Sequence, residues 1–350
     1  MTLPFTVAGR RLRIHPMALF AAALYVFPYV VVAGGKSTVN ASEFLIWAVF
    51  AMGLNLLWGH TGDLSFGHGM FFGWGAYAAG RMSRRVAFVP LDLAVAALVA
   101  MLVAYPLAKI IVRRATGIYF AMITLAIGEM FYFLAIRMTK ITGGENGLVD
   151  IRLGKLAGID LARPANFYYM TAAVAFLAVL AAWRITRSPF GQVCRAIQQN
   201  RARVPFLGFD PVRYRERAFV YSAAICGVAG GLSAFLFRQV APDTLRWTTT
   251  GEAVLITMIG GLNSFFGPAA GAVSVKFLEA TLIARPERWA RLYWPGVIGA
   301  VFAIMVLVAP GGLAGVAERV RALVRNRFAA GRGASGAPGT PVAPVEGTAA

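Results

Sequence analysis

Long apolar runs, separated by short polar segments, dominate this chain. Apolar and aromatic residues make up 58% of the 350 positions, and only 14% are charged, against roughly 25% in an ordinary soluble domain. A helix that crosses a bilayer needs about 20 mostly apolar residues. The pattern predicts an all-α, polytopic membrane helix bundle with about ten transmembrane segments. The ten runs are Met17–Ala33, Phe44–Trp58, Leu64–Gly80, Val89–Leu107, Ile118–Ile136, Phe167–Trp183, Ala218–Phe237, Ala253–Gly260, Ala269–Leu282 and Trp294–Val308.

This composition excludes a disordered chain, a secreted disulfide scaffold and most soluble enzymes. Two cysteines cannot form a framework of bridges, and three scattered histidines do not indicate a zinc site. The chain contains no Walker-type phosphate loop, no Gly-x-Ser-x-Gly elbow and no His-Glu-x-x-His motif. We therefore expect no catalytic residue, no metal ligand and no cofactor on this chain. A nucleotide, if one is used, would bind to another chain.

The chain divides into three parts. Residues 1–16 are predicted to be a cytoplasmic segment, because Arg10, Arg11 and Arg13 precede the first apolar run. That run is longer than the apolar region of a signal peptide, so we expect it to be retained as a helix. Residues 17–312 form the transmembrane domain, with a cytoplasmic loop at 184–217. Residues 313–350 are predicted to be a basic amphipathic helix, at about 314–328, followed by a disordered tail.

Ten crossings would return both termini to the cytoplasm. On that topology 19 of the 34 basic residues lie inside, 14 lie outside and Lys276 lies in a membrane segment. The bias follows the positive-inside rule only weakly. A net charge of +19 would also fit a nucleic-acid-binding protein, but the apolar segments argue against that class, and we expect contact with membrane lipid and no nucleic acid.

Two apolar regions are interrupted by glycine, at residues 59–63 and at residues 260–264. Irregular backbone at membrane depth is tolerated only where protein or a wet cavity surrounds it, and paired interruptions are typical of transporters. A tight hairpin at the membrane surface explains each break equally well, and both interpretations stay open here. The run Ala253–Gly260 is too short to span alone.

Small-residue faces predict close helix packing. They occur on three of the apolar runs, and lipid provides no hydrophobic force between helices, so close approach through glycine holds a bundle together. The glycines concerned are Gly69 and Gly73, Gly227, Gly230 and Gly231, and Gly267 and Gly271.

Four ionisable residues fall at or near membrane depth: Asp63, Glu129, Lys276 and Glu279. Such groups are costly unless they are paired or face a cavity, so each is a candidate for the transport pathway or for a structural role. Lys276 and Glu279 lie three residues apart and can pair on one helix face. Asp63 either caps the following helix or contacts substrate. Glu129 requires a partner on another helix.

The loop at 184–217 contains a predicted short helix. Ser188 is suited to the N-cap and Pro189 to the first helical position. A helix this short is not stable alone in water, so its apolar side must be covered. Two alternatives stay open for this cover: the membrane surface, or a groove on a cytoplasmic protein. The apolar side carries Val193, Ala196 and Ile197, and the other side carries Gln192, Arg195 and Gln199.

Five motifs, in this order, resemble a known family. They are GLNLLWGHTGDLSFGHG at 53–69; GIYFAMITLA at 117–126 with Gly128-Glu129; TGGENGL at 142–148; SPFG at 188–191 with Arg195-Ala196-Ile197 and Leu207-Gly208; and GGLNS at 260–264 with Gly267-Pro268 and Gly271-Ala272. Together they are similar to the LivM-type permease of branched-chain amino acid ABC importers. The resemblance covers roughly residues 41–312.

The resemblance implies a transport subunit that is not an enzyme, in a multi-pass protein of the inner membrane. Its partners would be a LivH-type second permease, two cytoplasmic ATPase subunits that bind ATP, and an extracytoplasmic substrate-binding protein. The cargo would be branched-chain or other hydrophobic amino acids. Importers of urea or short amides share these motifs, and an ion-coupled carrier using Glu129 or Asp63 is a further alternative. The implied ATPase-coupling residues are Ser188, Pro189, Phe190, Gly191, Arg195, Ala196, Ile197 and Gly208.

The chain departs from the family in this coupling loop. The family usually places acidic residues after the Arg-Ala-Ile motif, whereas here Gln198-Gln199-Asn200-Arg201 follows, and residues 188–209 contain no carboxylate. Docking on the ATPase must therefore differ in its ion pairs. The outer basic residues Arg81, Arg84 and Arg85 would, on this reading, meet an acidic face of the binding protein.

Overall fold

The structure is a computed structural model that describes residues 3–7, 10–14, 16–156, 158–285, 287–309, 311–316 and 319. Helices dominate it, as predicted. Nine of the ten apolar runs lie entirely in helices, and the run Leu64–Gly80 enters its helix only at His68. The long helices are α1 (Pro16–Ala33), α2 (Thr38–Thr61), α3 (His68–Ser83), α4 (Val89–Leu107), α5 (Ile118–Arg137), α7 (Pro164–Arg187), α9 (Pro211–Phe237), α10 (Trp247–Gly260), α11 (Gly267–Ile283) and α12 (Arg288–Val308).

The remaining elements are short. A π-helical turn, η1 (Ala108–Val112), extends α4, and the helical pieces α6 (Thr139–Thr142), η2 (Gly144–Asn146), α8 (Pro189–Gln199), η3 (Val204–Leu207) and η4 (Pro242–Leu245) lie in the connections. Strands β1 (Leu3–Val7) and β2 (Arg10–Ile14) pair antiparallel, with Leu3 opposite Ile14. Strands β3 (Lys155–Leu156) and β4 (Ile159–Asp160) form a second antiparallel pair.

Six of the described helical segments are long and apolar enough to cross a membrane: α1, α2, α4 with η1, α5, α7 and α9. The other four that carry predicted runs, α3, α10, α11 and α12, are shorter apolar helices or fall outside these limits. The multi-pass architecture is therefore supported, and the number of ten crossings stays a prediction. The amphipathic helix expected at 314–328 and the tail beyond it lie almost entirely outside the described residues.

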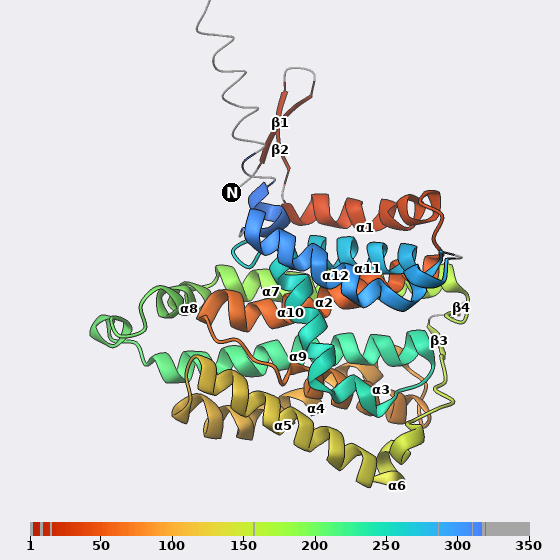
Figure 1. Ribbon diagram of the computed structural model, residues 1–350, viewed down its shortest axis with the longest axis horizontal. Helices are drawn as coiled ribbons and strands as arrows, with labels where there is room; N and C mark the ends of the chain where they lie inside the picture. Colours follow the sequence, from red (N-terminus) through yellow and green to blue (C-terminus); the bar gives the residue numbers. More distant parts are fainter. Residues whose placement is uncertain are drawn as a thin grey trace, which may run out of the picture.

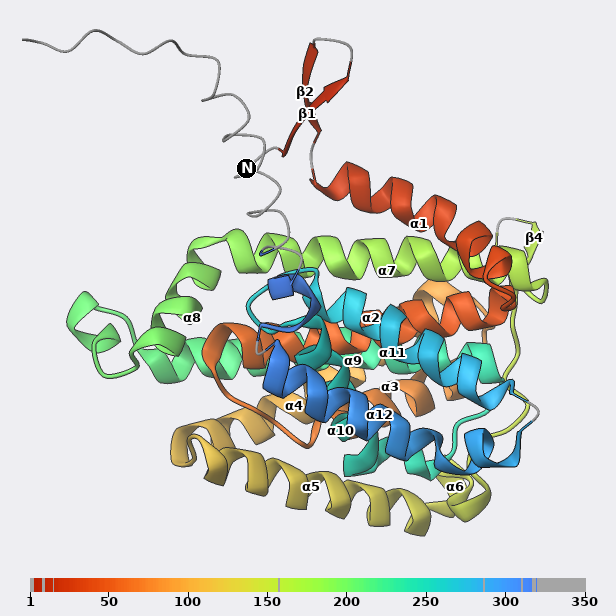
Figure 2. The ribbon, with the colours of Figure 1, turned by 45° about the horizontal axis from the view of Figure 1, so that its top comes forward.

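Helix α9 occupies the centre of the bundle and packs against α2, α3 and α4. The long helices run broadly alongside one another, with α8 at one end of the molecule and α6, β3 and β4 at the other (Figure 1). In Figure 2, α1 lies to one side of the bundle, above α2 and α7. Few of its side chains are buried, whereas most of those in α2 are.

Glycine makes the central packing possible, as the sequence predicts. A methyl group on Gly230 would lie 1.8 Å from the Phe72 carbonyl oxygen of α3. A methyl on Gly75 of α3 would lie 2.3 Å from the Gly227 carbonyl oxygen of α9. The two backbones therefore touch at these points, and any larger side chain would force α3 and α9 apart.

The helices end at both glycine interruptions. Helix α2 ends at Thr61, where Gly62 adopts φ 79° in the left-handed region, and α3 begins only at His68. Helix α10 ends at Gly260, where Gly261 has φ 107°, and α11 begins at Gly267. With 14 residues, α10 is shorter than a spanning helix requires, and it crosses the bundle at a steep angle to α11 (Figure 1).

Candidate functional site

The helix predicted in the polar loop is present as α8, and it begins where expected. The Ser188 hydroxyl accepts a hydrogen bond from the Gly191 backbone N–H at 3.4 Å, and Pro189 is the first helical residue. A methyl on Gly191 would lie 2.3 Å from the Thr186 carbonyl oxygen. Because α7 ends at Arg187, the chain turns directly from one helix into the next, and only glycine fits inside that turn.

The apolar side of α8 is covered by this chain itself. Val193 and Ile197 are buried together with Val204 of η3, and Tyr214 of α9 packs against them. Cys194 is also buried, and burial raises the pKa of its thiol to about 12. The cover that both sequence-based interpretations placed outside the chain is therefore provided, for Val193 and Ile197, by the chain itself. The loop from Asn200 to Asp210 folds back and supplies the cover that a short helix needs.

Phe190 fastens the start of α8 to α9. Its ring stacks on Tyr214 at 5.4 Å between centroids and meets Tyr221 edge-on at 5.6 Å. Among the residues proposed for coupling, Phe190 and Ile197 are therefore anchoring residues on the inner side of α8. Ala196 is half-buried, whereas Arg195 is exposed on the outer side.

The outer surface of this loop is polar on α8 and apolar at its tip. Gln192, Arg195 and Gln199 are exposed. At the tip, the Phe206 side chain is 91% exposed and that of Leu207 is 66% exposed, just before Gly208, which adopts φ 81°. The exposure of this pair was not predicted, although Leu207-Gly208 belongs to one of the five motifs. The available signal was an apolar pair between Pro205 and Gly208, two residue types that favour a turn.

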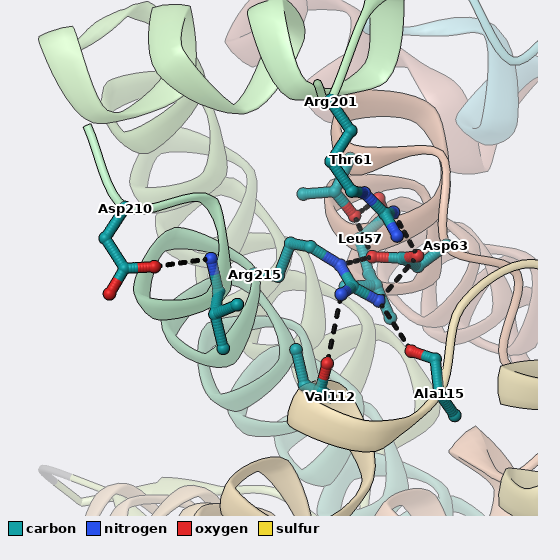
Figure 3. A network of polar contacts seen from close by, with 9 residues as sticks. Leu57, Thr61, Asp63, Val112, Ala115, Arg201, Asp210 and Arg215 are labelled. Atoms are coloured by element: carbon teal, nitrogen blue, oxygen red, sulfur yellow. Dashed lines mark hydrogen bonds and ion pairs between the residues drawn. The ribbon is translucent and has the colours of Figure 1, made fainter. Parts of the chain in front are cut away.

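Beneath α8 lies a buried ion-pair network, named here the anchor network, of Asp63, Arg201 and Arg215 (Figure 3). The Arg215 guanidinium donates to both Asp63 carboxylate oxygens, at 2.5 and 2.9 Å. Arg201, which follows α8, donates to the same carboxylate at 2.9 Å. Asp63 and Arg215 are only 1% and 2% exposed. The paired, bidentate geometry compensates for the cost of burying these charges.

The anchor network also holds the backbone around it. Arg215 donates to the carbonyl oxygens of Val112, at 3.0 Å, and Ala115, at 3.1 Å, just after α4. Thr61, at the end of α2, donates to Asp63 at 3.2 Å. The network therefore ties the ends of α2, α4 and α9 to the segment that follows α8. Asp63 does not cap α3, as one sequence interpretation expected, because its carboxylate is fully used by these donors.

A second link joins α9 to the end of α4. Glu216 lies next to Arg215, and its carboxylate accepts hydrogen bonds from Lys109 at 2.5 Å and from Arg113 at 2.8 Å. The hydrogen bond to Glu216 raises the pKa of the Arg113 guanidinium. Arg215 and Glu216 are adjacent in α9, and both therefore bind the end of α4, one through a cationic and the other through an anionic side chain.

Lys276 forms the centre of a second buried group, named here the Lys276 cluster. Its ammonium donates to Glu279 at 2.8 Å, which is the contact predicted from their spacing. It also contacts Glu252 of α10, lies 4.0 Å from Glu43 of α2, and sits 4.2 Å from the centre of the Trp47 ring. No local sequence pattern identified Glu252 and Glu43 as partners, because they come from other helices.

Glu129 has a partner on another helix, as its position required. Its carboxylate accepts a hydrogen bond from the Trp247 backbone N–H at 3.0 Å. Trp247 is the first residue of α10, so Glu129 of α5 places a negative charge at the positive end of that helix. This contact links α5 to α10 and accounts for Glu129 without a substrate.

Comparisons with known proteins agree with this architecture. The family model described as the permease component of branched-chain amino acid transport systems matches residues 40–309. The high-affinity branched-chain amino acid transport permease protein LivM of Salmonella typhimurium is 27% identical, over 85% of this chain and 73% of the relative. The corresponding LivM of Escherichia coli is 27% identical, over 84% and 74%.

A more distant relative is a LivH protein, not a LivM protein. The probable branched-chain amino acid permease LivH of Methanocaldococcus jannaschii is 24% identical, over 77% of this chain and 88% of the relative. No solved structure matches this chain significantly.

Proposed function

This chain belongs to the family of branched-chain amino acid transport permeases, and we propose that it is the permease subunit of an ATP-driven importer. In this proposal it carries branched-chain or other hydrophobic amino acids across the inner membrane, through ten crossings, with both termini in the cytoplasm. A LivH-type permease completes the pathway, two ATPase subunits bind and hydrolyse ATP, and an extracytoplasmic protein delivers the substrate.

The observation that carries this proposal is the construction of α8. Its inner face is packed onto the ends of α2, α7 and α9, and the anchor network ties the following segment to Asp63. Its outer face and the Phe206-Leu207 tip are exposed. A loop that is firmly held on one side and free on the other is suited to transmit a force from a docked partner.

The proposed mechanism follows from these contacts. The ATPases bind the outer face of α8 and the tip, and ATP binding moves them. Because Arg201 and Arg215 share the Asp63 carboxylate, displacement of the loop shifts α2, α4 and α9 together. ATP thereby changes the relative populations of outward-open and inward-open states through its different affinity for the two.

The test uses the complete complex in proteoliposomes, with both permeases, both ATPases and the binding protein. The variant combines Phe206→Ser with Leu207→Ser, which removes the apolar tip and no buried contact. We expect normal assembly of the two permeases, loss of most ATPase binding, and an uptake of radiolabelled leucine at least about tenfold slower, as expected for two apolar anchors worth more than about 1 kcal/mol each. Arg195→Glu should produce a weaker effect in the same direction.

The matched control is Tyr119→Ser. Tyr119 is 75% exposed and lies at the start of α5. The substitution therefore removes a similar exposed apolar surface outside the loop. Unchanged leucine uptake and ATP hydrolysis in the tip variant would overturn the coupling role. Uptake driven by a proton gradient without ATP would identify an ion-coupled carrier instead, and uptake of urea but not leucine would identify the related amide importers.

A further inference from the structure

A cavity of about 330 Å³ lies between α3 and α4 at the end of the bundle opposite α8. This placement follows from hydrogen bonds between the end of α3 and the connection that contains α6. Arg81 donates to the Ile141 carbonyl oxygen at 3.2 Å, and Ser83 donates to the Arg152 carbonyl oxygen at 2.7 Å. The cavity is open at the surface of the molecule, and neither the anchor network nor the Lys276 cluster contributes to it.

The rim of the cavity is cationic. Arg81 and Arg85 both line it, and no carboxylate among the described residues forms an ion pair with either guanidinium. The single hydrogen bond from Arg81 to Ile141 leaves most of its donors free, and Arg85 has no partner in the described part of the chain. Two uncompensated arginines at one opening favour an anionic ligand.

Two buried donors on the cavity wall also lack partners. Tyr77 and Trp74 lie one helical turn apart on α3, and both line the cavity. The Tyr77 hydroxyl and the Trp74 indole N–H make no hydrogen bond, although Tyr77 is only 2% exposed. A buried donor without an acceptor costs about 1–3 kcal/mol. A ligand with several acceptor oxygens would relieve that cost.

The deeper wall of the cavity is apolar. Val95 and Val99 of α4 line it, together with Ala78 of α3. These valines lie six and ten residues after Val89, where α4 begins, or about 9 and 15 Å along the helix. A soluble protein docked on this end of the bundle would not reach that depth. The cavity therefore combines a cationic rim, a middle with unused donors and an apolar floor along a membrane-crossing helix.

We propose that this cavity binds an anionic phospholipid. The phosphate lies between Arg81 and Arg85, the Tyr77 and Trp74 donors contact phosphate or ester oxygens, and one acyl chain lies along Val95 and Val99. Arginine guanidinium groups form strong hydrogen bonds to phosphate oxygens, and tyrosine and tryptophan are enriched at the level of the lipid headgroups at both membrane surfaces. This occupant accounts for basic residues at the end of the bundle where the sequence analysis expected an acidic face of a binding protein.

The experiment measures lipid retention by the purified permease complex. The complex is exchanged into nanodiscs with equal amounts of phosphatidylglycerol and phosphatidylcholine of identical acyl chains, extracted mildly and analysed by native mass spectrometry. We expect preferential retention of phosphatidylglycerol. Arg81→Gln combined with Arg85→Gln should reduce this preference roughly ten- to thirtyfold, because each arginine contributes about 1 kcal/mol of attraction to an anionic headgroup. Arg85→Gln alone should reduce it about fivefold without disturbing the Ile141 contact.

A second variant tests the apolar floor without changing charge. Val99→Phe should fill the space for the acyl chain and lower retention of both lipids. The charge-matched control is Arg152→Gln with Arg163→Gln, which removes two exposed basic residues of the same connection outside the cavity, and it should retain phosphatidylglycerol like the wild type.

Three outcomes would overturn the proposal. The first is equal retention of the two lipids by the wild type, and the second is unchanged retention after both arginine substitutions. The third is a salt-dependent loss of binding-protein affinity in the double arginine variant while lipid retention stays normal, because that result assigns the rim to the binding protein.

Discussion

The anchor network and the Lys276 cluster place buried charge at opposite ends of α2, yet they are built differently. Asp63 follows the last turn of α2, and Glu43 lies in its second turn. In the anchor network two arginines share one carboxylate, and backbone carbonyls accept the remaining donors. In the Lys276 cluster three carboxylates surround one ammonium group. The first arrangement is satisfied within the chain, whereas the second carries surplus negative charge.

This difference has consequences for rigidity. The acid and both bases of the anchor network come from segments far apart in the sequence, and its two central residues are almost completely excluded from solvent. The carboxylates of the Lys276 cluster are partly exposed, and a cavity of about 330 Å³ lies beside Lys276, Glu43 and Glu279. We therefore expect the anchor network to act as a fixed joint and the Lys276 cluster to tolerate changes in charge.

Removal of Arg215 should have the largest effect. Arg215→Met leaves the buried Asp63 carboxylate with only the partly exposed Arg201, and loss of one partner from a buried ion pair costs about 3–5 kcal/mol. Thermal unfolding of the purified complex should show a large fall in the melting temperature. The matched control is Arg213→Met, two residues away and 73% exposed, which should cost less than about 1 kcal/mol. Equal effects of the two substitutions would contradict the anchor role.

Removal of Lys276 should have an intermediate effect. Lys276→Met leaves three neighbouring carboxylates without a counter-ion, and we expect a loss of about 1.5–3 kcal/mol at neutral pH, the value of hydrogen bonds to charged groups. The loss should shrink as the pH falls, because protonated carboxylates need no counter-ion. Adding Glu252→Gln should restore part of the stability. If the stability of Lys276→Met did not change with pH, charge would not be the cause of the loss.

Neutralising Glu43 should have the smallest effect, and one of opposite sign to the first two. The Glu43 carboxylate is 4.0 Å from the Lys276 ammonium, beyond hydrogen-bond distance, and it adds to the surplus negative charge. Glu43→Gln should therefore change stability by no more than about 0.5 kcal/mol, towards stabilisation. Asp63→Asn, the corresponding change at the other end of α2, should be strongly destabilising. Similar melting temperatures for these two variants would remove the distinction between the clusters.

Local patterns in the sequence were sufficient for much of the fold. Each apolar run forms a helix over most or all of its length, since an uninterrupted apolar run favours internal backbone hydrogen bonding in lipid. The start of α8 at Ser188-Pro189 and the contact between Lys276 and Glu279 were also predictable, because capping and i, i+3 pairing depend only on neighbouring residues. Close packing through glycine faces could be predicted, although not that α3 would meet α9.

The sites depended on contacts that no local pattern contains. Asp63 and Arg215 are 152 residues apart, so their pairing required α2 and α9 to be adjacent. The apolar side of α8 signalled that a cover was needed, but only the folded loop showed that Val204 and Tyr214 provide it. The unpartnered donors of Tyr77 and Trp74, in the cavity between α3 and α4, could not be identified from the sequence at all. Whether a tyrosine or tryptophan finds an acceptor depends on its three-dimensional surroundings.

Sequence alone thus established a multi-pass helical permease and its family, since hydropathy, glycine and short motifs are properties of adjacent residues. The tertiary structure decided which charges are compensated, which face of α8 is exposed and where a cavity remains. These are questions of which helices lie side by side, and the energy of a buried charge depends on the neighbours that packing provides.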